Sequence, residues 1–239
     1  MSDRFLNKVV VVAGGTGALG QAVTQAFLAE SAKIVVTYRR PDEFEDLRKA
    51  AGNSALSLSG LSLDVTDDAA TEAAVQRIAA EHDRLDILVN AVGGYAGGAP
   101  LWSTAPAVLD RMLALNLRSI FSLCRAVVPV MLNQQSGSIV NIASRAALDP
   151  PAGLAGYAAS KAAAIAMIDS LAMDLKNSGV RVNSVIPSIF DTPENRKAMP
   201  NADFAKWPKP ENISKVLLFL CSDDAKLIRG ATIPVYGDT

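Results

Sequence analysis

The chain has 239 residues, of which 50% are hydrophobic and 20% are charged. Its 23 basic and 24 acidic side chains leave a formal net charge of −1, which excludes the strongly basic surface of a nucleic-acid-binding protein. A chain of this length can form one large undivided core. We therefore expect a single domain over residues 1–239 that binds no nucleic acid.

The apolar runs of the sequence are short. Those at 87–89 and 216–220 fall far below the roughly 20 residues of a membrane-spanning helix. The opening stretch, MSDRFLNKVVVVAGG, leads straight into a glycine loop and lacks the pattern of a signal peptide. We expect a cytoplasmic protein without a membrane partner.

The cysteines and the single histidine show no pattern of a catalytic or metal-binding site. Cys124 and Cys221 both lie in apolar helical patterns, where a free cysteine usually behaves as a small buried hydrophobe. The single histidine, His82, ends a polar helical segment, so neither a zinc site nor a histidine-dependent triad is expected. We predict no metal site and expect tyrosine, lysine, serine or carboxylates to carry any chemistry.

Short β-branched runs alternate with longer helical patterns along the chain. The seven candidate strands are residues 8–13, 33–38, 56–65, 86–91, 137–143, 180–186 and 231–236. This alternation predicts a parallel sheet with helices on both faces. The expected fold class is α/β, a doubly wound Rossmann fold.

One long segment, at about 188–210, separates the sixth candidate strand from the last helical pattern. It is rich in proline, asparagine and aspartate. A connection of this length in a compact domain is often a lid over a site. We expect a substrate lid; the alternative is a floppy insertion.

The stretch GGTGALG follows the first candidate strand and leads into a helical pattern. Gly15, Gly17 and Gly20 match G-x-G-x-x-G in the strand–loop–helix context that a dinucleotide-binding motif requires. The glycines let the backbone approach a pyrophosphate, and the helix N-terminus offers free amides to the anion. We expect cofactor contacts from Gly14, Thr16, Gly17, Leu19 and Gly20.

The end of the second candidate strand bears on which dinucleotide is bound. Folds that take NAD place an acid about 20 residues after the glycines, at the ribose 2′-hydroxyl, whereas an arginine accommodates a 2′-phosphate. Tyr38 stands at the position of the acid and is followed by Arg39 and Arg40. Because a guanidinium suits phosphate, we predict NADP(H) over NAD(H), with Arg39 as the contact. The alternative is that both arginines are solvated and the preference is decided elsewhere.

The stretch YAASK, at 157–161, places a phenol and an ammonium on one face of a helix, because positions i and i+4 are neighbours. Ser144 lies 13 residues before Tyr157 and follows the fifth candidate strand, at the strand end where doubly wound folds bind ligands. With Asn116 in LALNLRS and VNAVGG at 89–94, this layout resembles the short-chain dehydrogenase/reductase family over nearly the whole chain.

The resemblance implies four catalytic roles. Tyr157 would be the general acid that protonates a carbonyl oxygen, and Lys161 would lower the pKa of its phenol and bind the nicotinamide ribose. Ser144 would hydrogen-bond the substrate oxygen, and Asn116 would hold a water that links Lys161 to solvent. Further implied cofactor contacts are at the adenine (Asp64, Val65), the adenosine side (Asn90, Ala91) and the nicotinamide carboxamide (Pro187, Ile189, Thr192).

Three positions depart from the family pattern. Ala18 stands in place of the middle glycine of Thr-Gly-x-x-x-Gly-x-Gly, so that Gly17 would supply the close approach. Ala91-Val92 replaces the second asparagine of the Asn-Asn-Ala-Gly turn, and Ser188 replaces glycine after Pro187. None of these changes removes a proton-transfer group.

A narrower likeness concerns the loops. Together with GGTGALG, the segments GGYAGG (93–98), 146–157 and 191–207 resemble those of quinonoid dihydropteridine reductases, a branch of the same family. That branch usually has an acid after the second strand and lacks the serine, whereas this chain has Arg39 and Ser144. We therefore expect NADPH-dependent reduction of a ketone or 3-oxoacyl-like substrate. Pteridine reduction is the alternative, and a non-catalytic NADP(H)-binding sensor is a third hypothesis.

Two further expectations concern the loops and the assembly. Tyr95 and Trp207 would stack on a flat substrate or close a lid, unless they only pack their loops. Helical patterns at 114–134 and 155–178 are apolar on more than one face, which indicates burial. The family uses these helices in a dimer interface, so the resemblance implies a homo-oligomer, a tetramer or dimer, unless the helices are buried within the monomer.

Overall fold

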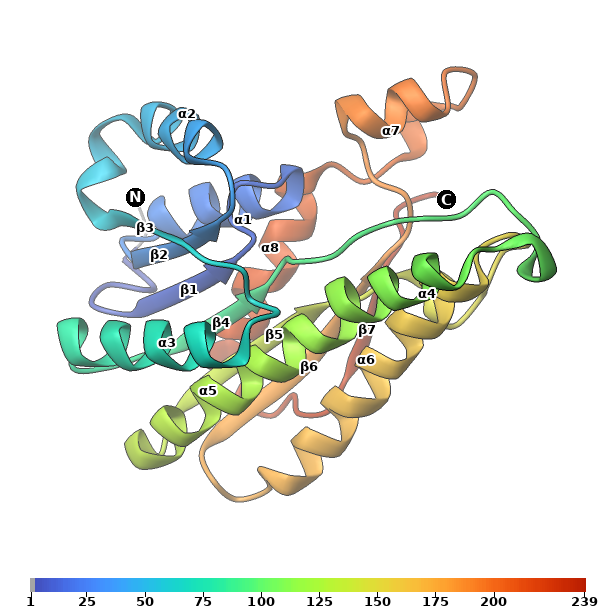
Figure 1. Ribbon diagram of the computed structural model, residues 1–239. Helices are drawn as coiled ribbons and strands as arrows, with labels where there is room; N and C mark the ends of the chain where they lie inside the picture. Colours follow the sequence, from blue (N-terminus) through green and yellow to red (C-terminus); the bar gives the residue numbers. More distant parts are fainter. Residues whose placement is uncertain (1–2) are drawn as a thin grey trace.

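The computed structural model describes residues 3–239, which contain a seven-stranded parallel sheet (Figure 1). The spatial order of the strands is β3-β2-β1-β4-β5-β6-β7. Their bounds are β1 Val9–Ala13, β2 Lys33–Tyr38, β3 Leu58–Ser62, β4 Ile87–Asn90, β5 Gly137–Ile142, β6 Val180–Pro187 and β7 Thr232–Val235. The predicted doubly wound α/β fold is confirmed.

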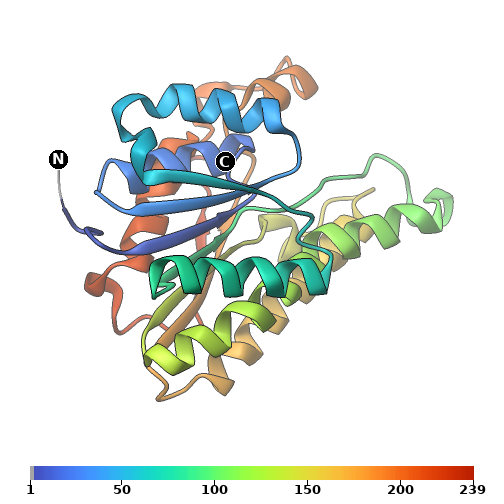
Figure 2. The same cartoon turned by 60° about the vertical axis from the view of Figure 1, so that its left-hand side comes forward.

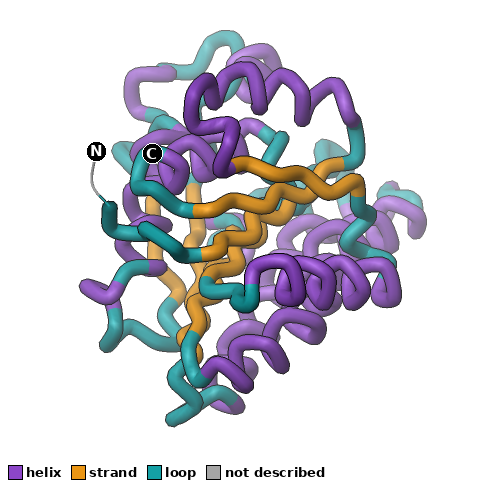
Figure 3. The backbone as a smooth tube through the Cα atoms, turned by 90° about the vertical axis from the view of Figure 1, so that its left-hand side faces the viewer, coloured by secondary structure: helices purple, strands orange, loops and turns teal. Residues whose placement is uncertain are grey.

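Helices cover both faces of the sheet, as the turned views show (Figures 2 and 3). One face carries α1 (Ala18–Leu28), α2 (Pro41–Ala51) and α8 (Pro210–Cys221). The other carries α3 (Asp68–His82), α5 (Ser119–Gln134) and α6 (Ala155–Asp174). Two shorter helices, α4 (Pro106–Leu113) and α7 (Pro193–Ala198), complete the set.

The central strand β1 explains why its sequence is an unbroken apolar run. Val10 and Val12 join the core on the side of α1 and α8, while Val9 and Val11 join the core on the side of α3 and α5. A parallel strand covered on both faces has no solvated side. The alternation of a half-exposed strand is therefore absent from its sequence.

Two expected elements are shorter than their patterns suggested. The strand expected at 56–65 is limited to β3, because residues Gly52–Ser57 wind into a 3-10 helix before it. The helix expected at 155–178 ends at Asp174. Asn177 and Gly179 follow with φ of 69° and 82°, a left-handed conformation that a right-handed helix cannot continue.

One helical run, Pro106–Gln134, is long and apolar enough by length and composition to cross a membrane. It is made of α4, a π-helical turn (Ala114–Arg118) and α5. In the fold, α5 packs on α3 and α4 packs on α6. Ile120, Leu123 and Val127 are buried in the core, so core packing accounts for the apolar character of this run.

A buried carboxylate ties the start of β4 to β1. Asp86 is 5% exposed and accepts hydrogen bonds from the Val9 amide at 2.9 Å and from Arg84 at 2.7 and 2.5 Å. Burial works against its ionisation, but the hydrogen bonds from Arg84 and Val9 and the charge of Lys8 outweigh that effect and lower the pKa of Asp86. The carboxylate is therefore ionised in the folded protein down to acid pH.

We predict that Asp86→Asn lowers the free energy of unfolding at pH 7 by about 1–3 kcal/mol, because charge-assisted hydrogen bonds become neutral ones. The folded-state pKa lies below the unfolded value of about 3.9, so this stabilisation is complete above that value and is lost as the pH falls through the folded-state pKa. Denaturant titrations at pH 7 and pH 3 measure the free energy of unfolding of the variant and of the wild type.

Asp46→Asn, which removes an exposed partner of Lys49, is the control, and its free energy of unfolding should stay close to that of the wild type. An equal penalty for Asp86→Asn at both pH values would contradict the prediction.

Candidate active site

The predicted site residues gather at the carboxyl edge of the sheet. β1 and β4 are neighbours in the sheet, with Ala13 opposite Asn90. The strand that follows β1 in the sequence lies on one side of this pair, and the strand that follows β4 lies on the other side. Such a switch point is where doubly wound folds bind ligands. The segments that follow β1, β4, β5 and β6 therefore meet around one site.

The glycine loop after β1 is tight. A Cβ on Gly20 would lie 2.1 Å from the carbonyl oxygen of Gly14, and a Cβ on Gly15 would lie 2.5 Å from the Val36 side chain. Gly17 is the N-cap of α1, without a side-chain cap and without an acid in the first turn. The first amides of α1 are thus open to an anion, and the loop fits the pyrophosphate of a dinucleotide.

Thr16 and Leu19, also expected to bind the cofactor, differ in where their side chains lie. Leu19 lies in the first turn of α1, and its side chain is buried in the core, so it offers only its backbone to a ligand. Thr16 is 7% exposed, and its hydroxyl donates to a carboxylate oxygen of Glu43 at 3.0 Å. Glu43 belongs to no sequence motif; its one local signal is its place in the first turn of α2, directly after the two arginines.

The adenosine side is lined by the segments after β2, β3 and β4. Arg39 is exposed and forms no hydrogen bond or ion pair within residues 3–239. Hydrogen bonds from Thr66, together with the charge of Arg39, lower the pKa of Asp64, and Val65 beside it is buried. The structure thus brings Arg39 and Asp64 near each other.

Asn90 and Ala91 continue from the end of β4. The Asn90 side chain donates to Asn141 at 2.9 Å and accepts from the Val92 amide at 3.2 Å. The Ala91 amide donates to the Ala13 carbonyl at 2.9 Å. These bonds fix the turn after β4 against the glycine loop.

The first turns of α6 bring Tyr157 and Lys161 to the end of β5. Lys161 is 6% exposed and donates from Nζ to the carbonyl of Ile142 at 3.0 Å. Ser144 follows β5 and accepts from the Ala146 amide at 3.2 Å, and its side chain lies near enough to Tyr157 to affect the pKa of that phenol. Ser144, Tyr157 and Lys161 therefore form one cluster.

The electrostatics of this cluster differ from the expectation for Tyr157. Burial raises the pKa of Tyr157, the hydrogen bond with Ser144 opposes that effect, and Tyr95 adds to it. The expected lowering by Lys161 is absent: its Nζ is directed to the Ile142 carbonyl, and burial lowers its own pKa to about 8. The phenol is protonated at neutral pH and can donate a proton.

Asn116 lies in the π-helical turn between α4 and α5 and is 1% exposed. Its side chain bonds to the amide and the carbonyl of Gly94, at 2.9 and 3.0 Å, and to the hydroxyl of Ser160 at 2.9 Å. A Cβ on Gly93 would lie 3.0 Å from Asn116 Oδ1 and 3.1 Å from Lys161 Nζ. Asn116 thus fixes the turn after β4 beside Lys161, while its expected link through a water stays a prediction.

Residues expected at the nicotinamide lie after β6. Pro187 ends that strand, Ile189 follows, and Thr192 is the N-cap of α7, accepting from the Asn195 amide at 3.1 Å. All three residues thus lie on the segment that runs from the end of β6 to the start of α7.

The segment 188–210 contains α7 and a 3-10 helix at Phe204–Lys206. Arg196 binds Asp191 at 2.5 and 2.8 Å, and its guanidinium lies 4.8 Å from the Phe204 ring. Trp207 is 7% exposed and meets Phe204 edge-on at 5.0 Å. The segment folds around its own side chains, so Trp207 packs the loop.

Tyr95 behaves differently from Trp207. It is 66% exposed, and its ring stands edge-on to Tyr157 with the centroids 5.2 Å apart. Of the two aromatic candidates, Tyr95 is therefore the one that stands at the cluster of Ser144, Tyr157 and Lys161.

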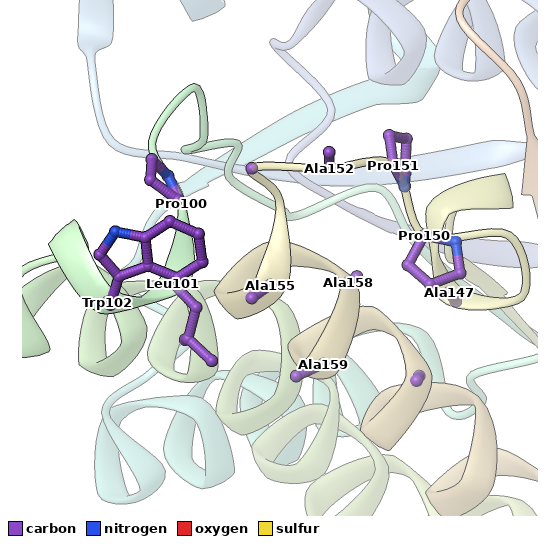
Figure 4. A pocket seen from close by; sticks show the side chains of 12 residues that line it. Pro100, Leu101, Trp102, Ala147, Pro150, Pro151, Ala152, Ala155, Ala158 and Ala159 are labelled. Carbon is purple, nitrogen blue, oxygen red and sulfur yellow. The ribbon is translucent and has the colours of Figure 1, made fainter.

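A hollow of about 620 Å³ lies on another face of α6 (Figure 4). Leu101 and Trp102 form one wall, Pro150 and Pro151 another, and alanines of α6 form the floor. Its lining has no titratable side chain and does not include Ser144, Tyr157 or Lys161. The hollow is therefore separate from the catalytic cluster.

Other reactive side chains lie away from the cluster. Burial raises the pKa of Cys124 and of Cys221 to about 12, so both are unreactive thiols. Within residues 3–239, no three His, Cys, Asp or Glu side chains are grouped to hold a metal ion.

Comparison with known proteins agrees with this geometry. A family model described as short chain dehydrogenase matches residues 8–203. The chain belongs to this family. It is 30% identical to the 3-oxoacyl-[acyl-carrier-protein] reductase FabG of Thermotoga maritima, with 98% of each chain covered. The family consists of oxidoreductases that use NAD(P) and act on small molecules, so the expectation of an enzyme is confirmed.

Solved structures share the fold closely. ElxO with NADP bound superposes with a TM-score of 0.91 at 23% identity, covering 96% of this chain and 97% of that one. NAD⁺-bound xylitol dehydrogenase also gives 0.91, at 24% identity, covering 98% and 99%. At these identities the two likenesses show the shared fold.

We predict that Lys161→Met raises the free energy of unfolding at pH 7 by about 1–3 kcal/mol, because the buried ammonium is costly while a methionine fills similar space. The lysine has a pKa of about 8 in the folded protein and 10.5 as its model value. The gain is therefore largest below pH 8 and shrinks as the pH rises from 8 towards 10.5. Denaturant titrations across this range measure it, with the exposed Lys49→Met as the control. A destabilised Lys161→Met variant at pH 7 would refute the prediction.

Proposed function

We propose that this protein reduces a carbonyl group of a ketone or 3-oxoacyl-like substrate, with NADP(H) as the hydride carrier and Tyr157 as the general acid. The observation that carries the proposal is the cluster in which a buried, protonated Tyr157 lies near Ser144, on the same helix as the buried Lys161. The likeness to a 3-oxoacyl reductase at 30% identity supports this substrate class.

The roles of the protein groups follow from their chemistry. The dinucleotide supplies hydride when it is bound. The Ser144 hydroxyl donates a hydrogen bond to the substrate oxygen and orients it, and Tyr157 gives that oxygen its proton as negative charge develops. The ammonium of Lys161, one helical turn further along α6, would bind the nicotinamide ribose. Ser144 thus binds and orients the substrate, and Tyr157 moves the proton.

The preference for NADP(H) is supported by Arg39. It is exposed directly after β2 and forms no ion pair within the described residues. Its guanidinium is therefore available for a ribose 2′-phosphate. Arg40 is less available, because it pairs with Glu43.

A second candidate is pteridine reduction. The specific observation in its favour is Tyr95, whose exposed ring stands beside Tyr157 and offers a stacking surface to a flat bicyclic substrate. The serine beside Tyr157 favours the carbonyl instead, because a hydroxyl donor has a direct use on a carbonyl oxygen.

Turnover of NADPH is the test of the proposed function. With a panel of β-ketoacyl thioesters, small diketones, aromatic ketones and quinonoid dihydropterin, we expect the fastest consumption with a ketone or thioester. Tyr157→Phe should lower kcat for that substrate by about 10²–10⁴-fold, because the proton donor is removed, while NADP⁺ binding in calorimetry remains. Faster turnover of the pterin would reverse the order of the two candidates, and full activity of Tyr157→Phe would exclude Tyr157 as the acid.

We also propose a cytoplasmic homo-oligomer, a tetramer or dimer, without a membrane partner. Support comes from apolar side chains on the outer surface of α5 and α6, where Phe121 is 47% exposed and lines a hollow with Met167. Sedimentation velocity of the purified protein should give a mass two or four times the 25.1 kDa of one chain. Fractionation of lysed cells should recover the protein in the soluble fraction. A 25.1 kDa species at micromolar concentration, or recovery with membranes, would oppose this assignment.

A further inference from the structure

The structure places a carboxylate between the glycine loop and the two arginines that follow β2. One oxygen of Glu43 accepts from the Thr16 hydroxyl at 3.0 Å, and the other accepts from the guanidinium of Arg40. Glu43 is part-buried, with 30% of its side chain exposed. The carboxylate therefore joins two segments that flank the ribose position of a dinucleotide.

The backbone that carries Glu43 is firmly positioned. Pro41 begins α2, and Phe44, next to Glu43, stacks on Tyr38 with the ring planes 5° apart and the centroids at 4.9 Å. Gly60 on β3 has no side chain at the place where Phe44 sits, since a Cβ there would lie 2.6 Å from the ring. The first turn of α2 is thereby held against β2 and β3, and Glu43 with it.

The charges near this point are balanced. Arg40 is engaged by Glu43, and the charge of Arg39 already acts on Asp64. In dinucleotide folds, a carboxylate near the end of β2 accepts hydrogen bonds from the ribose hydroxyls of NAD, whereas a 2′-phosphate requires cations. Sequence reading finds no acid at position 38, but the fold supplies one from position 43.

We propose that Glu43 is a specificity-determining residue that opposes Arg39: its carboxylate accepts the ribose 2′-hydroxyl of NAD(H) and repels the 2′-phosphate of NADP(H). That Glu43 and Arg39 act in opposite senses rests on the proposed function, in which Arg39 binds the 2′-phosphate. With Glu43 present, the preference for NADP(H) is smaller than Arg39 alone would give. Without its charge, Glu43 no longer repels the phosphate, and Arg40 loses its ionic partner, so that the positive charge of Arg40 acts on the phosphate as well.

The test compares calorimetric dissociation constants of NADP⁺ and NAD⁺, which differ only in the 2′-phosphate, and it needs no substrate. Glu43→Gln keeps the size of the side chain and removes its charge. We expect the ratio Kd(NAD⁺)/Kd(NADP⁺) to rise about tenfold or more, as the removal of a like charge at close range allows. Glu45→Gln is the matched control, because Glu45 lies on the same helix and pairs with Arg48 on the surface; its ratio should stay at the wild-type value.

Two results would overturn the proposal: an unchanged ratio in Glu43→Gln, or an equal change in Glu45→Gln, which would show a general charge effect. Thermal unfolding of both variants separates specificity from stability, since a purely structural role of Glu43 would lower Tm and leave the ratio unchanged. Arg39→Gln distinguishes this proposal from the proposed cofactor preference. If Arg39→Gln leaves NADP⁺ binding unaltered, the preference through Arg39 fails, while the response of Glu43→Gln still decides the role of Glu43.

Discussion

The pairing of β1 with β4 is the constraint on which the rest of the site depends. Their register places Ala13 opposite Asn90, and the next pair places Asn90 opposite Asn141. Three strands thus end at the same level, and the segments that follow them cannot avoid one another. A parallel sheet concentrates its strand ends on one edge, so residues far apart in the sequence become neighbours there.

Burial governs the chemistry of that edge. The core packed on α6 keeps Lys161 from solvent, which costs stability and lowers the pKa of its ammonium to about 8. The same burial keeps the phenol of Tyr157 protonated. Burying these groups lowers the stability of the folded protein, but it holds a proton donor and a cation together in a poorly hydrated site, where perturbed pKa values can serve a reaction.

The opposite side of the site is governed by exposed charges. Around the adenosine position, two arginines and two carboxylates lie on different segments, and a 30%-exposed glutamate connects them to the glycine loop. Exposed ion pairs contribute less free energy than buried ones, so a substitution there changes ligand preference at little cost in stability. In this chain, the dinucleotide preference therefore rests on a few charged side chains and not on the backbone arrangement.

The sequence by itself determined the fold class and the main catalytic candidates. Seven apolar runs separated by helical patterns, a glycine motif in a strand–loop–helix context, and the spacing of Tyr157 and Lys161 are local signals, readable without contacts. The tertiary structure alone decided how these parts interact. That burial raises the pKa of Tyr157, that Trp207 packs its own loop while Tyr95 faces the cluster, and that Glu43 reaches Thr16 all depend on distances between segments. Periodicity shows which face of a helix is apolar, but not which side chain of a distant segment lies against it.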